Sequence, residues 1–326
     1  MKQSILSNIK PEAEKLDQLM RSDLEVIDNP LLAEVVAYAI FNGGKRIRPL
    51  LTVLSARLCG CEALEELYRL ALTFEYLHAA SLLHDDVIDH AEQRRGRIAA
   101  NKAWGNTHVI LAGDFLHSRA MWLAGTLGGK QCLDKICQAA SAMVESEFLQ
   151  LQNAQRTETS EEYYFQVLKG KTAALIAAAC ETGVIFAGGT PDKRAALALF
   201  GSNLGLSFQI IDDLLDYQGD PARTGKAVGN DFQEGKMTLP LIYAMSQDGG
   251  GAGQALSVIL KDEPAGRRHS FARARDLIEE AGGFSYARQR AGELIDEAMR
   301  GLEIFPAGPG KDLLGALAAY VLERDK

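Results

Sequence analysis

Long hydrophobic runs are missing from this 326-residue sequence. No stretch of 18 or more apolar residues occurs, so we expect no membrane span. Cysteine is scarce: the five cysteines include no Cys-x-x-Cys pair, which argues against a disulfide framework and against a zinc site. The first residues, MKQSILSNIKPEAEK, become charged too early for a signal peptide. These absences together predict a cytoplasmic protein with reduced thiols.

Positive charge is not in excess either. The net charge is −8 and the isoelectric point is about 5.4, which argues against nucleic-acid binding. Alternating strand-type runs are scarce, and no linker rich in proline and serine divides the chain. Hydrophobic residues make up 47% of the chain, enough for a substantial core. We therefore predict an all-α fold, a single-domain helical bundle over residues 1–326.

What the sequence does contain is helical periodicity. Apolar residues recur at three- and four-residue spacing, which is typical of amphipathic helices, and glycine pairs separate the segments. Two segments, 171–186 and 196–211, are apolar on most faces and are expected to be buried. We predict helices over residues 4–24, 31–41, 46–59, 62–89, 107–127, 130–155, 161–168, 171–188, 192–217, 237–247, 252–260, 270–281, 284–302 and 310–323.

Two aspartate-rich motifs each follow an apolar helical run. They are Asp85-Asp86-Val87-Ile88-Asp89 and Asp212-Asp213-Leu214-Leu215-Asp216. In a helix, positions i and i+4 lie one turn apart on the same face. Carboxylates this close repel each other unless a cation lies between them. Mg²⁺ prefers oxygen ligands and is usually held by a few carboxylates together with substrate phosphates. The sequence therefore predicts magnesium ligands at both motifs.

Cations stand beside glycines at several places in the chain. The stretch Gly43-Gly44-Lys45-Arg46-Ile47-Arg48-Pro49 holds three of them, and Arg94-Arg95 follows the first aspartate motif. Two loops, 90–106 and 217–236, are polar and long enough to suggest a functional role. Further cations beside glycine include Lys171, Lys226 and Lys236. Because Lys and Arg are the usual partners of phosphate oxygens, the whole set suits ligands with two phosphorylated parts.

Five segments in this order resemble the trans-type isoprenyl diphosphate synthases. They are GGKRIRP (43–49), LHAASLLHDDVIDHAEQRRG (77–96), GKT (170–172), FQIIDDLLDY (208–217) and GKAVGNDFQEGKMTLP (225–240). The combination is far more specific than a single aspartate motif. The resemblance implies an all-α bundle around a deep central cavity, usually a homodimer. It also implies head-to-tail condensation of isopentenyl diphosphate with an allylic diphosphate.

The resemblance further implies a role for each candidate residue. The metal ligands would be Asp85, Asp86, Asp89, Asp212 and Asp216, holding three Mg²⁺ ions with the bound allylic diphosphate, and Asp213 would support them. Isopentenyl diphosphate would bind Lys45, Arg48, His78 and Arg95. The allylic diphosphate would contact Arg94, Lys171, Lys226 and Lys236. The allylic cation would be stabilised by Thr172, Gln209 and the carbonyl of Lys171.

Other interpretations of these residues stay open. His78 could be an ordinary helix histidine, Gln209 could satisfy a buried backbone group, and Thr172 could cap a helix. A class I terpene cyclase would share the ionisation chemistry but would not need the second diphosphate site. An HD-type phosphohydrolase would use His84-Asp85 but leave the second motif unexplained. A non-catalytic subunit of a heteromeric synthase would tend to lose the motifs, and both are intact here.

The length of the product depends on the residues just before Asp85. Ala80 lies about 7.5 Å below Asp85 along a helix, and both it and Ser81 are small. In family members that stop at farnesyl or geranylgeranyl diphosphate, an aromatic side chain commonly blocks one of these positions. We therefore predict a hexaprenyl to decaprenyl product, centrally octaprenyl, with geranylgeranyl or farnesyl diphosphate as the alternative. The candidates for the floor of the cavity are Leu77, Phe74, Tyr76, Met121 and Trp122.

Overall fold

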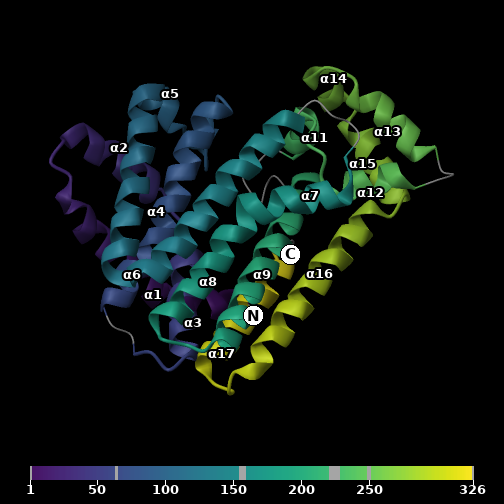
Figure 1. The fold of residues 1–326 in the computed structure, drawn as a ribbon. Helices are drawn as coiled ribbons and strands as arrows, with labels where there is room; N and C mark the ends of the chain where they lie inside the picture. The colour runs from purple at the N-terminus through teal and green to yellow at the C-terminus, as the bar shows by residue number, and fades with distance from the viewer. Residues whose placement is uncertain (1, 63–64, 154–158, 220–227, 248–250, 325–326) are drawn as a thin grey trace. The chain divides into compact units, whose positions relative to one another are not determined.

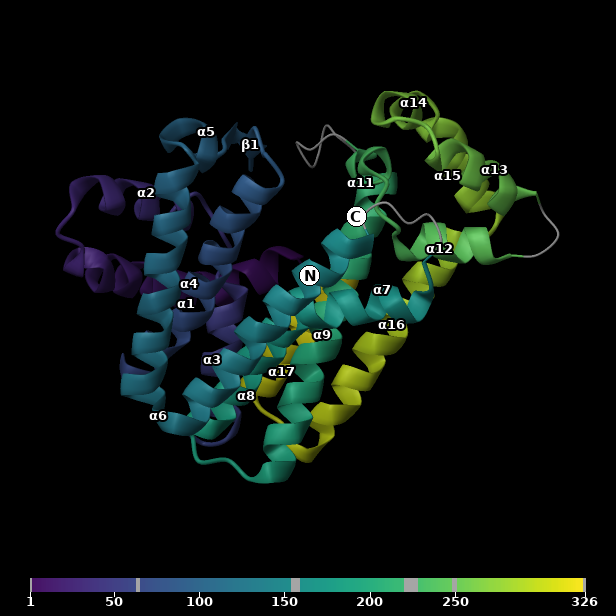
Figure 2. The same ribbon diagram turned by 45° about the horizontal axis from the view of Figure 1, so that its top comes forward.

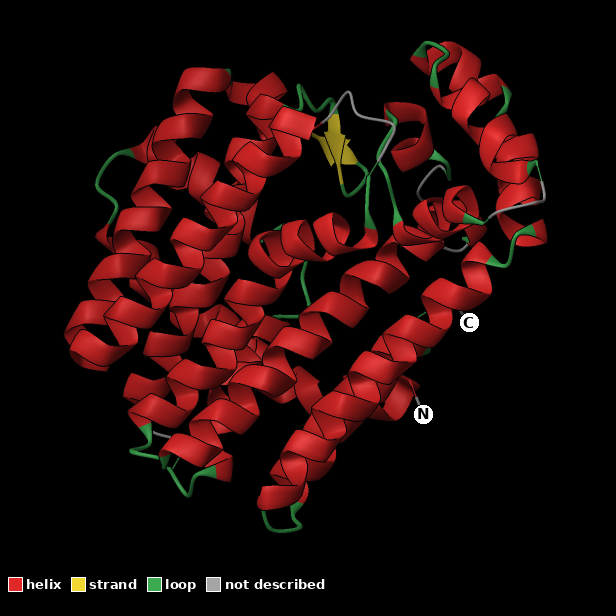
Figure 3. Ribbon diagram, turned by 45° about the vertical axis from the view of Figure 1, so that its right-hand side comes forward, coloured by secondary structure: helices red, strands yellow, loops and turns green. Residues whose placement is uncertain are grey.

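The computed structural model describes residues 2–62, 65–153, 159–219, 228–247 and 251–324. Helices dominate these residues, and their only strands form one short hairpin (Figure 3). The predicted all-α fold is confirmed. The chain forms two compact units. The first comprises residues 1–140, 175–198 and 304–316, and the second comprises residues 141–174, 199–303 and 317–326. The single-domain organisation stays a prediction.

The first unit is built around helix α4 (Glu65–Ile88), which packs against four other helices (Figure 1). These four are α1 (Lys2–Asp23), α2 (Pro30–Ile40), α3 (Ile47–Leu58) and α5 (Ala100–Trp104). The unit also contains η1 (Leu24–Val26), the hairpin of β1 (Gln93–Arg94) and β2 (Arg97–Ile98), the first part of α6 (Asn106–Asn153) and most of α8 (Ala174–Phe186). Leu67, Phe74 and Leu77 are buried on α4, so this helix forms the core of the unit.

The second unit is organised by α12 (Leu239–Ser246), which packs on α16 (Gly283–Gly301) and three neighbours (Figure 2). These neighbours are α7 (Glu161–Leu168), α13 (Ala252–Leu260) and α15 (Phe271–Glu280). Also present are the π-helix η2 (Lys169–Ala173), most of α9 (Pro191–Gln218), α11 (Asn230–Glu234), α14 (Pro264–His269), most of η3 (Leu302–Ile304) and the end of α17 (Pro309–Leu322). Tyr217 packs against Phe232, Phe271 and Phe284 at ring distances of 5.6–6.4 Å, which anchors the end of α9 beside Asp216.

Several helix starts follow from capping residues. Asn29 Oδ1 accepts the backbone N–H groups of Leu31 and Leu32 at 3.0 and 3.1 Å, and Pro30 occupies the first position of α2. Ser160 Oγ accepts the N–H of Tyr163 at 3.1 Å and begins α7 in the same way. These residues satisfy donors that the first turn of a helix leaves unpaired.

The observed helices α5, α11 and α14 lie outside every predicted helix, and the predicted helices themselves differ from the observed ones in two places. Those predicted over 107–127 and 130–155 form one long element, α6, with a break at Gly129 (φ 67°, ψ −172°). The helix predicted to start at residue 171 instead continues from α7 through η2, a π-helix. One described helix, α9, is long and apolar enough by composition to cross a membrane. Because 56% of its apolar window is buried in the fold, it has the burial of a core helix, and the absence of a membrane span stays a prediction.

Candidate active site

The first aspartate motif ends α4, and its three carboxylates differ in exposure. Asp86 is buried, and Arg94 on β1 donates to Asp86 Oδ1 through Nε at 2.5 Å. Burial raises the pKa of Asp86, and the contact with Arg94 lowers it in part. Asp85 is half-buried and Asp89 is exposed. The motif therefore presents Asp85 and Asp89, one turn apart, while Asp86 is held by a guanidinium.

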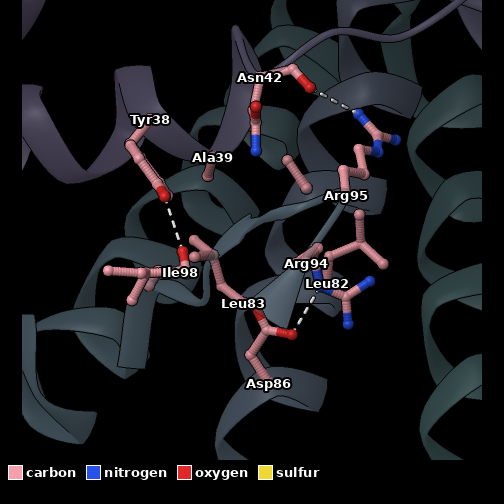
Figure 4. Close-up of a pocket in the computed structure, with 11 residues that line it drawn as sticks. Tyr38, Ala39, Asn42, Leu82, Leu83, Asp86, Arg94, Arg95 and Ile98 are labelled. Atoms are coloured by element: carbon pink, nitrogen blue, oxygen red, sulfur yellow. Dashed lines mark hydrogen bonds and ion pairs between the residues drawn. The ribbon is translucent and has the colours of Figure 1, made fainter. Parts of the chain in front are cut away.

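The hairpin that carries Arg94 and Arg95 contacts the segment between α2 and α3, residues 41–46, which we call the glycine loop (Figure 4). Arg95 and Gly96 both have positive φ, 52° and 74°, as a two-residue hairpin turn requires. Arg95 donates to the carbonyls of Asn42, at 3.3 Å, and Gly43. Tyr38 OH donates to Ile98 O at 2.6 Å, which fixes the far strand to α2. A pocket lined by Tyr38, Asn42, Leu83, Asp86, Arg94 and Arg95 opens beside these contacts.

Arg48 and His78 lie half-buried in a strongly basic region. The Nε of Arg48 is buried and has no hydrogen-bond partner among the described residues. Burial lowers the pKa of Arg48, and the charge of Arg95 lowers it further. Burial also lowers the pKa of His78 well below its usual value, with Arg48, Arg95, Arg94 and Arg46 adding to the effect. A buried guanidinium nitrogen without a partner, beside an exposed Lys45, is suited to an anionic ligand.

In the second unit, the middle aspartate of the second motif organises a chain of hydrogen bonds. Asp213 is buried and accepts from Tyr164 OH at 2.7 Å and from Gln209 Nε2 at 2.9 Å. Gln209 Oε1 in turn accepts from Thr172 Oγ1 at 3.2 Å. Burial and the charge of Asp231 raise the pKa of Asp213 to about 7. The structure thus brings Thr172 and Gln209 into contact, and their role at the allylic cation stays a prediction. Tyr164 was missed because nothing in its sequence neighbourhood marks a buried hydroxyl.

The outer aspartates of this motif have different partners. Asp216 accepts the backbone N–H groups of Asn230 and Asp231 at 3.3 and 2.9 Å. Burial and the charge of Asp231 raise the pKa of Asp216 to about 6. Asp212 pairs with Arg324 at 3.0 Å. Arg324 was also missed, because it lies 112 residues further along the chain and in no recognisable motif.

The predicted diphosphate-binding lysines of this unit lie among acidic groups. Lys171 donates to Glu147 and to Gln150, both at 2.9 Å. Lys236 pairs with Asp231 at 3.1 Å and Glu234 at 2.8 Å. Burial lowers the pKa of Lys236, but the charges of these two carboxylates raise it above the usual value. Lys226 lies outside the described residues.

The residues predicted to set the length of the product differ in their exposure to solvent. Ala80 and Leu77 are buried on α4, both 3% exposed, and the Ser81 hydroxyl donates to His78 O at 2.9 Å. Trp122 is instead 53% exposed, and the guanidinium of Arg119 lies 4.3 Å from its ring centre. A side chain on the surface cannot close an interior cavity of its own unit. The structure therefore does not support the predicted role of Trp122 as a floor.

The donor chemistry of the two aspartate motifs fits a hard divalent cation, because carboxylate oxygens are the ligands that Mg²⁺ prefers. Within the described residues, no three or more His, Cys, Asp or Glu side chains form a group that could hold a metal ion. The carboxylates nevertheless come in pairs one helical turn apart. Burial raises the pKa of Asp216, and repulsion from the charge of Asp231 raises it further. A divalent cation would relieve that repulsion.

The comparison with known proteins decides the family. The family model described as polyprenyl synthetase matches residues 29–276. The chain belongs to the polyprenyl synthetase family. This polyprenyl synthetase is 37% identical over 323 residues to the octaprenyl diphosphate synthase of Escherichia coli (strain K12), covering 96% of this chain and 99% of the relative. The predicted prenyltransferase is thereby confirmed.

Two solved structures resemble this polyprenyl synthetase over nearly its full length. One is a polyprenyl synthase from Caulobacter crescentus in complex with calcium and isoprenyl diphosphate. It is 34% identical, with a TM-score of 0.89, and the match covers 99% of this chain and 97% of that one. The other is a decaprenyl diphosphate synthase from Rhodobacter capsulatus. It is 36% identical, with a TM-score of 0.89, and the match covers 100% of both chains.

Proposed function

We propose that this polyprenyl synthetase adds isopentenyl diphosphate repeatedly to an allylic diphosphate and forms a long all-trans polyprenyl diphosphate, centrally octaprenyl. One observation carries the proposal. Besides a carboxylate motif in each unit, the chain has a separate basic region around Arg48 and His78. A terpene cyclase or a phosphohydrolase would use the carboxylates but would leave this second anion site without a ligand.

The chain's own residues supply most of the proposed chemistry. Asp85, Asp89, Asp212 and Asp216 would hold Mg²⁺, which supplies charge stabilisation for the departing diphosphate. Arg94 and Lys171 would bind the same leaving group. Gln209 is oriented by Asp213 so that its carbonyl oxygen faces Thr172. These fixed oxygen dipoles would stabilise positive charge on the allylic carbon.

The test is the mass of the product. We expect the purified protein with farnesyl diphosphate, isopentenyl diphosphate and MgCl₂ to yield hexaprenyl to decaprenyl diphosphates. A clean stop at geranylgeranyl diphosphate would contradict the long product. Turnover of an allylic diphosphate without any need for isopentenyl diphosphate would contradict the condensation itself. Chelation of the metal should abolish turnover, and Mg²⁺ should restore it.

A substitution on α4 tests how the product length is set. Ala80 is buried one turn below the motif, so Ala80→Phe should fill that space and shorten the product to farnesyl or geranylgeranyl diphosphate. Leu77→Ala should lengthen it. The matched control is Trp122→Ala, whose side chain is exposed and which should leave the product distribution unchanged. An unaltered product in Ala80→Phe would remove α4 from the control of chain length.

Assembly and location are part of the same proposal. We infer a homodimer, as the family resemblance implies, and apolar side chains exposed on α6 support it. A cytoplasmic location is proposed because all five cysteines are free thiols, as is usual in a reducing compartment.

A further inference from the structure

The glycine loop before α3 contains an arginine in an unfavourable backbone conformation. Gly43 and Gly44 have φ values of 77° and 155°, and Arg46 has φ 51° and ψ 36°, in the left-handed region. Glycine adopts such values freely, but a side chain makes them costly. A non-glycine residue persists there only when its surroundings over-determine its position. The side chain of Arg46 shows what fixes it.

All three guanidinium nitrogens of Arg46 are used inside the protein. Arg46 is 3% exposed. Its Nε donates to Asp17 Oδ1 at 2.7 Å, its Nη1 to Glu75 Oε1 at 2.6 Å, and its Nη2 to Ile40 O at 2.8 Å. These partners lie on α1, α4 and the end of α2. The guanidinium therefore ties the glycine loop to three helices and is too deeply buried to serve as a surface for a substrate.

The residues on both sides of Arg46 are those proposed to bind isopentenyl diphosphate. Lys45 precedes it directly, and Arg48 follows two positions later on α3. Glu75 lies on α4 one turn before His78, the third member of the same group. The Arg46–Glu75 pair thus joins the loop that carries Lys45 and Arg48 to the helix that carries His78. Glu75 is also the nearby negative charge that favours ionisation of both Arg48 and Arg95.

We propose that Arg46 and Glu75 are positioning residues for the isopentenyl diphosphate subsite. They do not contact the substrate. They fix the positions of Lys45 and Arg48 relative to His78. The inference rests on the proposed function, because it assigns the supports of a site which that function requires. It also explains why a strained arginine stands where a glycine would fit the backbone more easily.

A second ion pair in the same unit provides a matched control. Arg57 at the other end of α3 pairs with Glu12 on α1 at 2.8 Å and donates to Tyr68 OH on α4 at 2.6 Å. It therefore joins α3 to α1 and α4, two of the three helices that Arg46 contacts, again through an arginine–glutamate pair. It lies about 16 Å from Arg46 along the helix, at 1.5 Å per residue. Arg57→Lys loses the fork-shaped donor without reaching the subsite.

The experiment measures binding of isopentenyl diphosphate alone, by equilibrium dialysis, and the KM of both substrates. In Arg46→Lys, we expect Kd and KM for isopentenyl diphosphate to rise about tenfold through misplacement of the subsite cations. The KM for farnesyl diphosphate should change less than about twofold by the same reasoning. Arg57→Lys should leave all three values unchanged. Equal effects on both substrates, or equal effects in Arg57→Lys, would overturn the proposal.

The Glu75→Gln variant distinguishes a positioning role of Glu75 from a purely electrostatic effect of its charge. If Glu75 acted only as a nearby negative charge, its removal would make the site more positive and bind the diphosphate more tightly. As a positioning residue, its neutral replacement releases Arg46, and the affinity for isopentenyl diphosphate should fall. Tighter binding in Glu75→Gln would overturn the proposal. This nearly isosteric variant also decides the question if Arg46→Lys does not fold.

The wild-type protein separates this inference from the proposed function. If wild type neither binds nor consumes isopentenyl diphosphate, the proposed function fails, and the positioning role fails with it. If wild type binds and consumes it while Arg46→Lys and Glu75→Gln match wild type, only the positioning role is overturned.

Discussion

At the scale of single residues, the surroundings of His78 decide its chemistry. Burial disfavours its charged form, and four arginines repel a further positive charge, so its pKa lies well below the usual value. A neutral imidazole can donate one hydrogen bond to a phosphate oxygen without adding to the repulsion among the arginines. A bound cation would relieve the repulsion within each aspartate motif, whereas a bound anion would relieve the repulsion within this basic region.

The lowered pKa of His78 predicts a dependence of stability on pH. The unfolded chain binds a proton at His78 with a pKa of about 6.5, whereas the folded chain resists it. The unfolded state therefore binds more protons between the folded pKa and about 6.5, so stability should rise with pH through that window. Urea unfolding from pH 5 to 8 should show that His78→Gln has a shallower rise than wild type. Parallel curves for the two proteins would contradict the assignment.

Tyr164 is the residue that orients the proposed cation-stabilising group. Without its hydroxyl, Asp213 loses one of its two hydrogen-bond donors and holds Gln209 less firmly. Tyr164→Phe should lower kcat about tenfold through this misalignment and leave both KM values nearly unchanged. The control is Tyr286→Phe, which removes a similar bond to a carboxylate, Glu161, at 2.6 Å. A fall in kcat of similar size in both variants would contradict a specific role for Tyr164.

At the scale of elements, the sequence predicts what periodicity encodes and misses what tertiary contacts create. The long helices are found within a few residues of their predicted bounds, for example α9 at Pro191–Gln218 against 192–217. The hairpin, α5 and α11 all lie in segments predicted as loops. The two helices span five residues each and the strands of the hairpin two each, too short for a periodic pattern. The hairpin is held by contacts such as Tyr38 to Ile98. The π-helix η2 likewise has no pattern of its own.

The π-helix that carries Lys171 and Thr172 depends on a close approach to α6. A Cβ added at Gly170 would lie 2.5 Å from Ser146 Cβ and 2.7 Å from Ala142 O. Gly170→Ala should therefore push η2 away from α6, cost about 1–3 kcal/mol of stability and lower kcat. Urea denaturation and steady-state kinetics measure both effects.

Gly292 on α16 is the matched control for Gly170. Among the residues that the structure describes, no atom lies within 4 Å of a Cβ added there. Gly292→Ala should therefore stabilise the protein by about 0.5–1 kcal/mol, because alanine is the better helix former. A neutral result for Gly170→Ala would show that η2 can shift without strain.

At the scale of the whole molecule, partners distant in the chain complete the second aspartate motif. The aspartate motifs are visible in the sequence, but Arg324 on Asp212 and Tyr164 on Asp213 are not. Their sequence separations of 112 and 49 residues leave no local signal, since only folding brings them together. Residue types and short spacings could therefore be used to predict the chemistry, whereas the supporting contacts required the structure.

The proposed homodimer is supported by an exposed apolar face on α6. Val144, Phe148 and Leu151 lie on one face of α6 and are 59%, 63% and 52% exposed. Adjacent exposed apolar side chains of this size commonly mark an association surface. Light scattering on a sizing column should give twice the 35.4 kDa chain mass for wild type.

Phe148→Glu would place a charge at the centre of this apolar face, and a buried unpaired charge opposes association. We expect this variant to have the mass of a single chain. Val258 on α13 is equally exposed at 63% but is not part of the α6 face, so Val258→Glu should remain a dimer. If Phe148→Glu keeps the doubled mass while Val258→Glu loses it, the subunits associate through α13 instead of α6.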